Sequence, residues 1–311
     1  MALLELKNIT AGYDKNIILK DFNISVEKGE FVSLLGSSGC GKTTCLRLIA
    51  GFSEPMGGQI IFNGQDITHF DSRQMRDIRK DMQIIFQDPY SSLPPRDTVG
   101  GILSEPVEVH KIVPKAEVKQ YVLDLMDKCG LRDYYFERYP HEFSGGQRQR
   151  ICIARALSVN PKLVICDEPV SALDVSIQAQ VLNLLMDLQE KMGLTYMFVT
   201  HDLSVVRHIS DDICVMYLGQ LVETCPSKKL FEQPLHPYTK ALLSAIPSID
   251  LDRPMRRVEL KGEITSAINP KPGCRFAPRC PYACERCYEP QELTEVEEGH
   301  FVSCCRVKEI N

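Results

Sequence analysis

The stretch that decides the fold is Gly36-Ser37-Ser38-Gly39-Cys40-Gly41-Lys42-Thr43-Thr44, which fits the pattern GxxxxGK followed by Ser or Thr. It directly follows the apolar run Glu30–Leu35 and opens the amphipathic run Cys45–Ala50. A glycine-rich turn between a strand and a helix can curl its backbone N–H groups around phosphates. Lys42 would then reach the β and γ oxygens, and the Thr43 hydroxyl would bind Mg²⁺. The stretch therefore predicts a site for a nucleoside triphosphate with Mg²⁺.

A second motif points to the same chemistry. The apolar run Lys162–Cys166 ends in two adjacent acids, Asp167 and Glu168. A strand buried on both faces delivers its last side chains to the sheet edge where parallel α/β sheets bind ligands. We expect Asp167 to hold the Mg²⁺ shell and Glu168 to polarise the attacking water as a general base. Taken alone, the segment could also be a surface acidic pair that ends a strand.

The surrounding pattern indicates the fold class. Up to about residue 240, short apolar runs alternate with longer amphipathic stretches, which predicts an α/β sheet domain. Strands are expected at Leu3–Ile9, Glu30–Leu35, Gln59–Phe62, Met82–Phe86, Lys162–Cys166, Thr195–Val199 and Ile213–Tyr217. Helices are expected after Gly41, Asp97, Pro114, Gly146, Asp174 and Asp202. Beyond about Ala241, prolines break any long helix, so we expect a separate extension lying over the main domain.

Composition narrows the class of protein. The 311 residues are 44% hydrophobic and 25% charged, an ordinary globular balance. The 36 basic and 41 acidic residues give a net charge of −5, so we expect no nucleic-acid partner. No apolar run approaches the ~20 residues of a membrane span, and the start MALLELKNIT is unlike a signal peptide. We therefore expect the chain to remain in the cytosol.

A third motif carries a resemblance to a known family. Phe143-Ser144-Gly145-Gly146-Gln147 precedes the helix-compatible run Arg148–Leu157, and a serine with two glycines at a helix start forms an anion site. Together with the phosphate loop and the acid pair, this motif resembles the ATP-binding-cassette family, whose signature is LSGGQ. Phe143 replaces the usual leucine. The resemblance implies a head-to-tail dimer in which this motif reaches the γ-phosphate bound by the other subunit.

Other positions match the family pattern one by one. Tyr13 is similar to the aromatic residue that stacks on adenine, and Gln87 to the glutamine that reaches Mg²⁺ and contacts the membrane partner. Asp174 lies in a loop similar to the one that crosses the dimer seam, and His201 matches the histidine that contacts the γ-phosphate. The resemblance covers residues 1 to about 230. It implies a P-loop NTPase cassette with a RecA-like core, an antiparallel β subdomain and a helical subdomain.

The spacing of the motifs favours transport within this family. About a hundred residues separate Thr44 from Phe143 without sustained heptads, unlike the long coiled coils of DNA-repair members. Only one nucleotide motif is present, whereas translation-type members usually carry two cassettes. The motif spacing therefore favours a separate ATPase subunit that docks onto membrane proteins over a DNA-repair or translation member of the family.

The C-terminal part indicates the subtype. Leu235–Leu243 reads LHPYTKALL, and Gly273–Phe276, Pro278–Cys280 and His300–Cys304 follow it. These segments resemble the extension of the oligopeptide, dipeptide and nickel importer ATPases. Pro94 departs from the group, which commonly has asparagine there. The resemblance implies a cassette at residues 1–235, an extension at residues 236–311 and ATP hydrolysis that drives import of peptides or nickel.

Partners follow from the same resemblance. It implies two integral-membrane permease subunits, a second ABC ATPase subunit that is a copy or a paralogue, and, indirectly, an extracytoplasmic substrate-binding protein. The chain would lie on the cytoplasmic face of the bacterial cell membrane. The alternative is a soluble ATP-dependent regulator or assembly factor that uses its cysteines as a redox sensor.

The cysteines concentrate at the C-terminal end. Six of the 13 lie in the last 38 residues, and a reducing compartment makes thiols or metal ligands the better interpretation than disulfides. Cys274, Cys280, Cys287 and Cys304 occupy the positions that the extension pattern marks, with Cys284 and Cys305 as additions. Four thiolates suit zinc or an iron–sulfur cluster. The resemblance favours a [4Fe–4S] cluster, with zinc or free thiols as alternatives.

Overall fold

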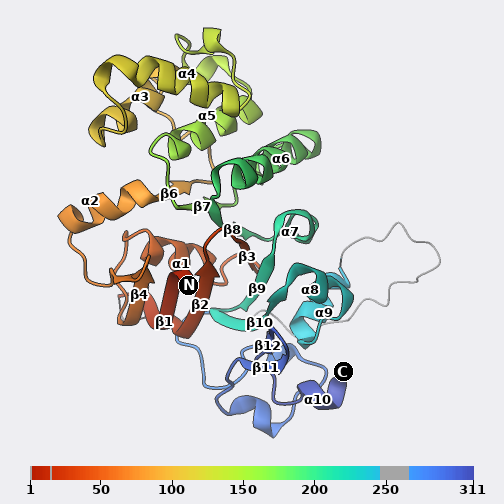
Figure 1. Ribbon diagram of the computed structural model, residues 1–311. Coiled ribbons are helices and arrows are strands. Elements are labelled where there is room, and N and C mark those ends of the chain that lie inside the picture. The colour runs from red at the N-terminus through yellow and green to blue at the C-terminus, as the bar shows by residue number, and fades with distance from the viewer. Residues whose placement is uncertain (1, 15, 246–265) are drawn as a thin grey trace. The chain divides into compact units, whose positions relative to one another are not determined.

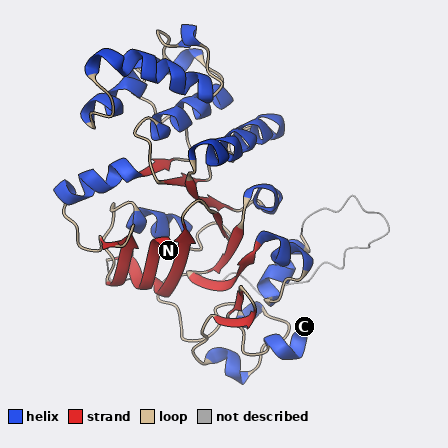
Figure 2. Ribbon diagram, viewed as in Figure 1, coloured by secondary structure: helices blue, strands red, loops and turns tan. Residues whose placement is uncertain are grey.

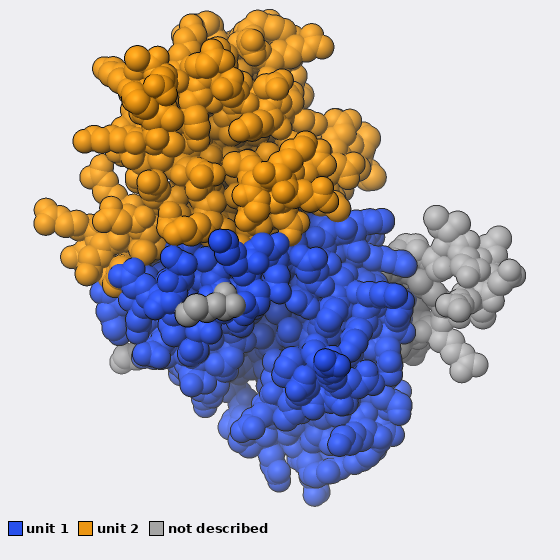
Figure 3. Space-filling model, viewed as in Figure 1, with its two compact units in different colours: residues 1–69, 199–311 blue, residues 70–198 orange. Residues whose placement is uncertain are grey.

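The computed structural model describes residues 2–14, 16–245 and 266–311, which divide into two units (Figure 3). Unit 1 comprises residues 1–69 and 199–311, and unit 2 comprises residues 70–198. The chain passes from unit 2 back to unit 1 within strand β8 (Thr195–Thr200). The described residues contain no helix that is long and apolar enough to cross a bilayer.

One sheet of unit 1 is antiparallel and is built from the N-terminal residues. Its order is β2-β1-β4-β5, and its strands are β1 (Ala2–Tyr13), β2 (Asn16–Glu27), β4 (Gly57–Phe62) and β5 (Gln65–Asp66). Leu4 of β1 pairs with Val26 on one side and Phe62 on the other, and all three side chains are buried. This row of cross-strand apolar pairs sets the register of the sheet.

Five further strands of unit 1 lie in the order β11-β12-β10-β9-β3 (Figure 2). They are β3 (Phe31–Leu35), β9 (Asp212–Tyr217), β10 (Gln220–Pro226), β11 (Thr294–Glu297) and β12 (His300–Val302). β3 and β9 are parallel, and the other neighbouring pairs are antiparallel. All five residues of β3 are buried, as is typical of a parallel strand covered on both faces.

The C-terminal extension is joined to this sheet rather than standing apart from it. Val302 of β12 pairs with Glu223 of β10, so residues far along the chain continue the sheet that carries β3. Phe276 is fully buried in a cluster that also holds Leu35, Tyr217 and Tyr238. The expectation of a separate extension lying over the main domain therefore needs correction, because its described residues share a core with the strands of unit 1.

The helices of unit 1 are short. They are α1 (Lys42–Ile49), α7 (Leu203–Ile209), α8 (Ser227–Glu232), α9 (Pro237–Leu243) and α10 (Val307–Ile310) (Figure 1). Pro237 occupies the first turn of α9, where its missing N–H costs nothing. The longest helix in the described part of the extension beyond Ala245 has four residues, which agrees with the prediction that prolines break long helices there.

Unit 2 contains two parallel strands and five α-helices among its described residues. The strands are β6 (Met82–Ile85) and β7 (Leu163–Asp167). The helices are α2 (Ser72–Asp81), α3 (Val99–Val109), α4 (Val118–Lys128), α5 (Gly145–Leu157) and α6 (Val175–Met192). Helices α3, α4 and α5 contact one another and bury Leu103, Val122 and Ile151 between them (Figure 1).

Most predicted elements are confirmed, within a few residues of their expected bounds. Among the elements that the prediction missed are β2, β5, β10, β11, β12, α2, α8 and α10. The consecutive exposed residues Lys20 and Asp21 interrupt the alternation of β2, and Asp21 has a positive φ of 52° with a register shift near it. Helix α2 buries only Met75 and is held by a capping box between Asp71 and Gln74. The alternation that remains in β2, from Phe22 to Val26, is short, and α2 buries a single apolar side chain.

Candidate nucleotide site and cysteine cluster

The phosphate loop joins β3 to α1 in unit 1 and requires glycine at two positions. A Cβ at Gly36 would lie 2.5 Å from the carbonyl oxygen of Met216 in β9, so the loop passes too close to that strand for a side chain. Gly41 precedes α1 with φ +104°, in the left-handed region that favours glycine. No side chain caps α1, and its first-turn N–H groups can therefore serve an anion.

The Lys42 side chain lies inside this loop. It is 5% exposed, and its Nζ donates to the carbonyl oxygens of Gly36 at 2.6 Å and Ser37 at 3.1 Å. The loop thus folds around a buried cation whose protein partners are neutral carbonyls. Such a cation is stabilised further by phosphate oxygens, because burial of a charge is costly unless an opposite charge accompanies it.

The remaining predicted residues of unit 1 differ in exposure. Ser38, Gly39 and Thr43 are exposed, whereas Cys40 and Thr44 are buried. Tyr13 is 45% exposed, and its hydroxyl lies 3.4 Å from the Thr44 hydroxyl, so the predicted adenine-stacking residue stands at the start of α1. His201 is exposed in the turn between β8 and α7.

In unit 2, three side chains gather where β6 and β7 end. The Gln87 Nε2 donates to Glu168 Oε2 at 3.2 Å and to Ser171 Oγ at 3.3 Å. The Ser171 hydroxyl also donates to the Glu168 carbonyl oxygen at 3.0 Å. The structure thus brings together the predicted residues Gln87 and Glu168. Ser171, which the sequence placed only in the loop before Asp174, holds both of them.

Glu168 has an unusual backbone. Its φ of +46° is in the left-handed region, which a residue with a Cβ rarely adopts. Strain of this kind persists where the surrounding structure imposes it, and it concentrates at functional sites. Asp167 is the last residue of β7 and is half-buried beside it. The two adjacent carboxylates thus lie at the end of β7, one in extended backbone and one in the left-handed region.

The predicted signature motif forms the start of α5. Ser144 caps the helix, with its hydroxyl accepting from the Gln147 N–H at 3.4 Å and its own N–H donating to Gln147 Oε1 at 3.0 Å. Gln147 also donates to the Tyr135 hydroxyl at 3.1 Å. A Cβ at Gly146 would lie 2.4 Å from Ile177 of α6, whereas Gly145 is exposed. Ser144 and Gly145 thus present an exposed helix start on a rigid turn.

Asp174 stands directly before α6 and is exposed. Its neighbour Val175 is 82% exposed, the largest exposed fraction among the large hydrophobic residues of the described chain. Both residues are therefore accessible at the start of α6.

The cysteines separate into two classes. The seven outside the extension are all buried: Cys40, Cys45, Cys129, Cys152, Cys166, Cys214 and Cys225. Burial raises the pKa of the Cys129 and Cys152 thiols to about 12, so these remain protonated packing residues.

The four cysteines predicted from the extension pattern line one pocket. Cys274, Cys280, Cys287 and Cys304 share it with Cys305 and with His236. Burial, together with the neighbouring thiols of Cys304, Cys287 and Cys280, raises the pKa of the Cys274 thiol to about 12. The pocket encloses a free volume of about 10 Å³, roughly that of one water-sized sphere. Among the described residues, the groups whose ligand atoms all lie within 4.8 Å of one another do not include this set of four.

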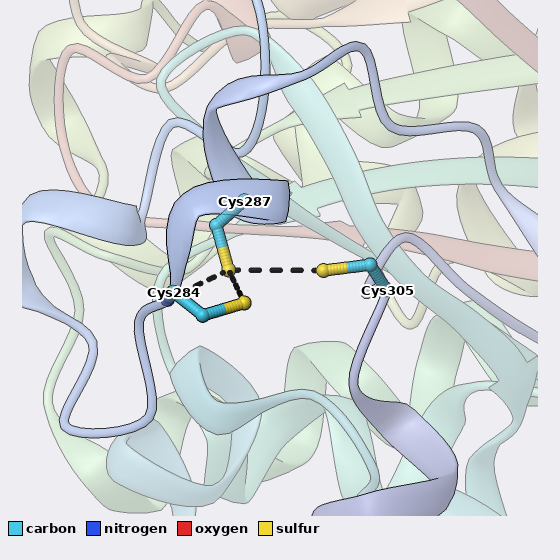
Figure 4. A group of neighbouring side chains, drawn as sticks. All are labelled: Cys284, Cys287 and Cys305. Carbon is cyan, nitrogen blue, oxygen red and sulfur yellow. Dashed lines mark hydrogen bonds between the residues drawn. The ribbon is translucent and has the colours of Figure 1, made fainter.

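The shortest sulfur distances involve the two additional cysteines. Cys287 Sγ lies 3.7 Å from Cys284 Sγ and 3.7 Å from Cys305 Sγ (Figure 4). The sequence interpretation set Cys284 and Cys305 aside as additions to the family pattern. Cys284 and Cys287 are spaced as C-x₂-C, a common metal-ligand spacing that was available in the sequence.

Two residues explain why the extension packs where it does. Arg275 donates from Nη1 to the carbonyl oxygens of Ile18, at 3.1 Å, and Leu218. Burial lowers the pKa of its guanidinium to about 10. Next to it, Phe276 packs against Tyr217 and Tyr238, with ring centroids 5.3 and 5.5 Å away. The motif Gly273–Phe276 is therefore a structural anchor.

His236 lies at the junction between the cysteine pocket and α9. Its Nδ1 accepts the N–H of Tyr238 at 3.1 Å and caps the helix. Burial lowers the pKa of the imidazole to about 4, although the Glu223 carboxylate opposes the shift. His236 is therefore a neutral, buried residue, and the sequence interpretation did not single it out as a site residue.

Comparisons with known proteins agree with this geometry. A family model described as ABC transporter matches residues 19–171, and one described as oligopeptide/dipeptide transporter, C-terminal region, matches residues 222–287. The first range contains the phosphate loop and Glu168. The second contains the described helix α9 and the cysteines from Cys274 to Cys287.

Characterised relatives match nearly the whole chain. The dipeptide transport ATP-binding protein DppF of Haemophilus influenzae is 47% identical over 290 residues, which is 93% of this chain and 89% of the relative. The oligopeptide transport ATP-binding protein AppF of Bacillus subtilis is 50% identical over 286 residues, or 91% and 87% of the two chains.

Solved structures are similar over most of the chain. The structure of cbiO1 from Clostridium perfringens, part of the ABC transporter complex cbiONQ, has a TM-score of 0.69 at 27% identity and covers 75% of this chain and 91% of that chain. A dimeric structure of MJ0796, a bacterial ABC transporter cassette, has a TM-score of 0.64 at 30% identity and covers 72% of this chain and 98% of that chain.

Proposed function

Because this chain belongs to the ABC transporter ATP-binding proteins that carry the oligopeptide/dipeptide-type C-terminal region, we propose that it is the ATP-hydrolysing subunit of a bacterial peptide importer. The observation that carries the proposal is the phosphate loop folded around the buried Lys42 ammonium, in a chain whose extension forms part of the same core. The names of the relatives favour peptides over nickel as the cargo.

We assign the binding of ATP and Mg²⁺ to the residues that match the family pattern. In unit 1, the N–H groups and Lys42 hold the phosphates, Thr43 contributes its hydroxyl to Mg²⁺, and Tyr13 stacks on the adenine. In unit 2, Asp167 belongs to the Mg²⁺ shell. The exposed position of Tyr13 beside Thr44 supports this role, since a stacking residue has to reach the ligand from the loop's edge.

Hydrolysis is assigned to three side chains. Glu168 accepts a proton from the attacking water, Gln87 orients that water and the Mg²⁺ shell, and His201 contacts the γ-phosphate. The bonds from Gln87 to Glu168 and Ser171 support the assignment, because they hold the proposed base in one orientation. Lys42 and the loop N–H groups stabilise the charge that develops on the phosphoryl oxygens.

A second cassette completes the proposed site. Ser144, Gly145 and Gln147 of one subunit would face the γ-phosphate bound by the other, and Asp174 would lie at the seam. The exposed helix start at Ser144 and the exposed Val175 support this surface as the dimer contact. The partner is a copy of this chain or a paralogue, and two permease subunits bind the pair at the cytoplasmic face of the membrane.

The experiment is affinity capture of the tagged chain from its host's membranes in mild detergent, with identification of every co-purifying protein. Two multi-span permeases and a second cassette subunit are the expected result. The similarity of the captured permeases to known permeases would also distinguish peptide transport from nickel transport. Capture of soluble partners only would contradict the importer proposal and favour a soluble regulator.

For the cysteines, we propose a thiolate-bound metal centre on the family set Cys274, Cys280, Cys287 and Cys304, which would cross-link segments within the extension at residues 236–311, next to the cassette at residues 1–235. The shared pocket supports a metal, and the family resemblance favours a [4Fe–4S] cluster over zinc there. A [4Fe–4S] cluster is larger than the present free volume of this pocket, so the side chains that line the pocket would have to move apart to admit it. Iron and acid-labile sulfide in anaerobically purified protein would identify the cluster, and zinc without iron would identify the alternative.

A further inference from the structure

A pocket of about 640 Å³ lies in unit 1, between the N-terminal sheet and the extension. One wall comes from β1 and β2, and the other comes from β10 and from residues 270–303. Its described lining contains no cysteine and none of the residues assigned to ATP or Mg²⁺. Its volume is in the range of small-molecule sites, about 300–1,000 Å³.

The wall formed by β1 and β2 is held by side-chain hydrogen bonds in addition to strand pairing. Asn8 and Asp21 have left-handed backbone, with φ of 51° and 52°. Asn23 lies between them and fixes both, because its Oδ1 accepts the Asn8 N–H at 2.8 Å and its Nδ2 donates to the Asp21 carbonyl oxygen at 2.9 Å. Irregular strand positions of this kind are common next to binding sites.

Arg275 supplies a half-buried cation to the opposite wall. Its Nη1 donates to the carbonyl oxygens of Ile18 and Leu218, whereas its Nε and Nη2 have no hydrogen-bond partner in the described part of the chain. A Cβ at Gly219 would lie 2.5 Å from that Nη1, so the guanidinium fits only against a glycine. A half-buried guanidinium whose side-chain bonds all go to neutral oxygens is a favourable partner for a carboxylate.

Four further charged side chains line the pocket, namely those of Lys20, Lys271, Asp21 and Glu292. All four are exposed, and within the described ranges none forms a side-chain hydrogen bond or an ion pair. The Asp21 carboxylate is close enough to Arg275 to oppose the lowering of the guanidinium pKa by burial. The pocket thus presents three positive and two negative groups. A purely anionic ligand would meet two like charges, whereas a ligand with both charges matches both signs.

Apolar surface completes the lining. Leu221 is buried in the floor and Leu293 is half-buried, and three prolines lie around them: Pro270, Pro272 and Pro290. Small-molecule sites typically combine such apolar surface with a few polar groups that fix the orientation of the ligand. The ligand that fits has an apolar body and opposite charges at its ends.

We propose that this pocket binds a small amino-carboxylate zwitterion, a free amino acid or a short peptide, whose carboxylate meets Arg275 and whose ammonium meets Asp21 and Glu292. The two lysines of the lining add to the attraction of the carboxylate. Because its walls belong to the N-terminal sheet and to the extension, the bound molecule joins these two parts of unit 1. Binding requires neither ATP nor hydrolysis, so it is independent of the proposed importer activity.

Isothermal titration calorimetry of the full, nucleotide-free chain tests the site. The probes are L-leucine, L-alanyl-L-leucine, the N-acetyl and C-amide forms of that dipeptide, and inorganic phosphate. We expect saturable binding of an unblocked probe with a Kd of about 1 mM or tighter. Each blocked form should bind about 10-fold more weakly, because it loses a hydrogen-bonded charge. The tighter of leucine and the dipeptide identifies the source of the ligand.

Two double variants separate the ends of the ligand. Asp21→Asn/Glu292→Gln should weaken the dipeptide about 10-fold and leave the N-acetyl form unchanged, since asparagine also tolerates left-handed backbone. Lys20→Gln/Lys271→Gln should weaken the dipeptide and leave the C-amide form unchanged. The matched control is Asp14→Asn, an exposed acid with φ of 53° outside the pocket, which should bind like the parent.

Equal affinities of the blocked and unblocked dipeptides would overturn the proposal, as would binding of both unblocked probes weaker than ~1 mM. Phosphate binding without dipeptide binding would show a plain anion site instead. An equal loss of affinity in Asp14→Asn and in the acidic double variant would also overturn it, because the effect would then not come from the pocket.

Discussion

The Glu223 carboxylate and the His300 imidazole form a fully buried pair, with Oε1 and Nε2 2.8 Å apart. The same carboxylate accepts the N–H groups of Leu235, at 2.7 Å, and His236, at 2.9 Å. One side chain of β10 therefore ties down both the entry to α9 and strand β12. The two ends of the extension are fixed to the sheet at a single point.

Replacing Glu223 with Gln should lower the free energy of unfolding by about 2–3 kcal/mol. The amide offers one acceptor oxygen where the carboxylate uses two, so one buried donor loses its partner. Chemical denaturation measures the change. Glu297→Gln, an exposed carboxylate on the neighbouring strand β11, should stay within ~0.5 kcal/mol of the parent protein. Equal effects of the two substitutions would contradict the role assigned to Glu223.

Replacing Phe276 with Ala should destabilise the protein by about 3–5 kcal/mol. The ring is fully buried between Tyr217 and Tyr238, and its removal leaves a cavity in the core of unit 1. Thermal or denaturant unfolding provides the measurement. Tyr288→Ala, which removes a 59% exposed ring of the same extension, serves as the control and should have little effect. If Phe276→Ala also had little effect, the extension would not share the core as described.

Replacing Glu168 with Gln should leave ATP binding intact and slow hydrolysis by about 100-fold or more. The amide can still lie beside Gln87, but it cannot accept a proton from water. Binding of labelled ATP and release of phosphate are measured on the same preparation. Glu190→Gln on the exposed face of α6 should hydrolyse ATP at the parent rate. Near-normal turnover in Glu168→Gln would refute its role as general base.

Stability should fall on acidification because of His236. The pKa of the His236 imidazole is about 4 in the folded chain, whereas an ordinary histidine has a pKa of 6.5. Between pH 6.5 and pH 4, the unfolded chain therefore binds a proton at His236 that the folded chain does not. The free energy of unfolding should therefore decrease by up to about 3 kcal/mol as the pH drops from 7 to 4. Denaturation of metal-free protein at several pH values measures this.

The control for that titration is His236→Asn, which keeps a helix-capping acceptor without an imidazole. The difference between the parent and this variant isolates the contribution of His236 to the pH dependence. The parent should lose more stability than the variant between pH 7 and 4. Parallel pH profiles would show that His236 is not the group responsible.

Local motifs were predictable because their geometry is set by neighbouring residues. Gly41 at φ +104°, Lys42 turned into its own loop and the Ser144 cap on α5 all depend on a few consecutive side chains. The prediction failed where local signals were weak, as at β2 and at the polar helix α2. β2 is stabilised by its pairing with β1, and α2 by its capping box. Neither interaction can be recognised from hydrophobic periodicity.

The sequence by itself determined the phosphate loop, the strand that ends in Asp167 and Glu168, and the signature helix, since each is a contiguous stretch whose residue types dictate the backbone. Only the tertiary structure decided that Glu223 meets His300 and that Cys305 joins Cys284 and Cys287. These residues are far apart along the chain, and burial of apolar surface, which is not directional, brings them together. The cysteine spacing could suggest a metal site, but only the folded chain determines which of the cysteine sulfurs lie close together.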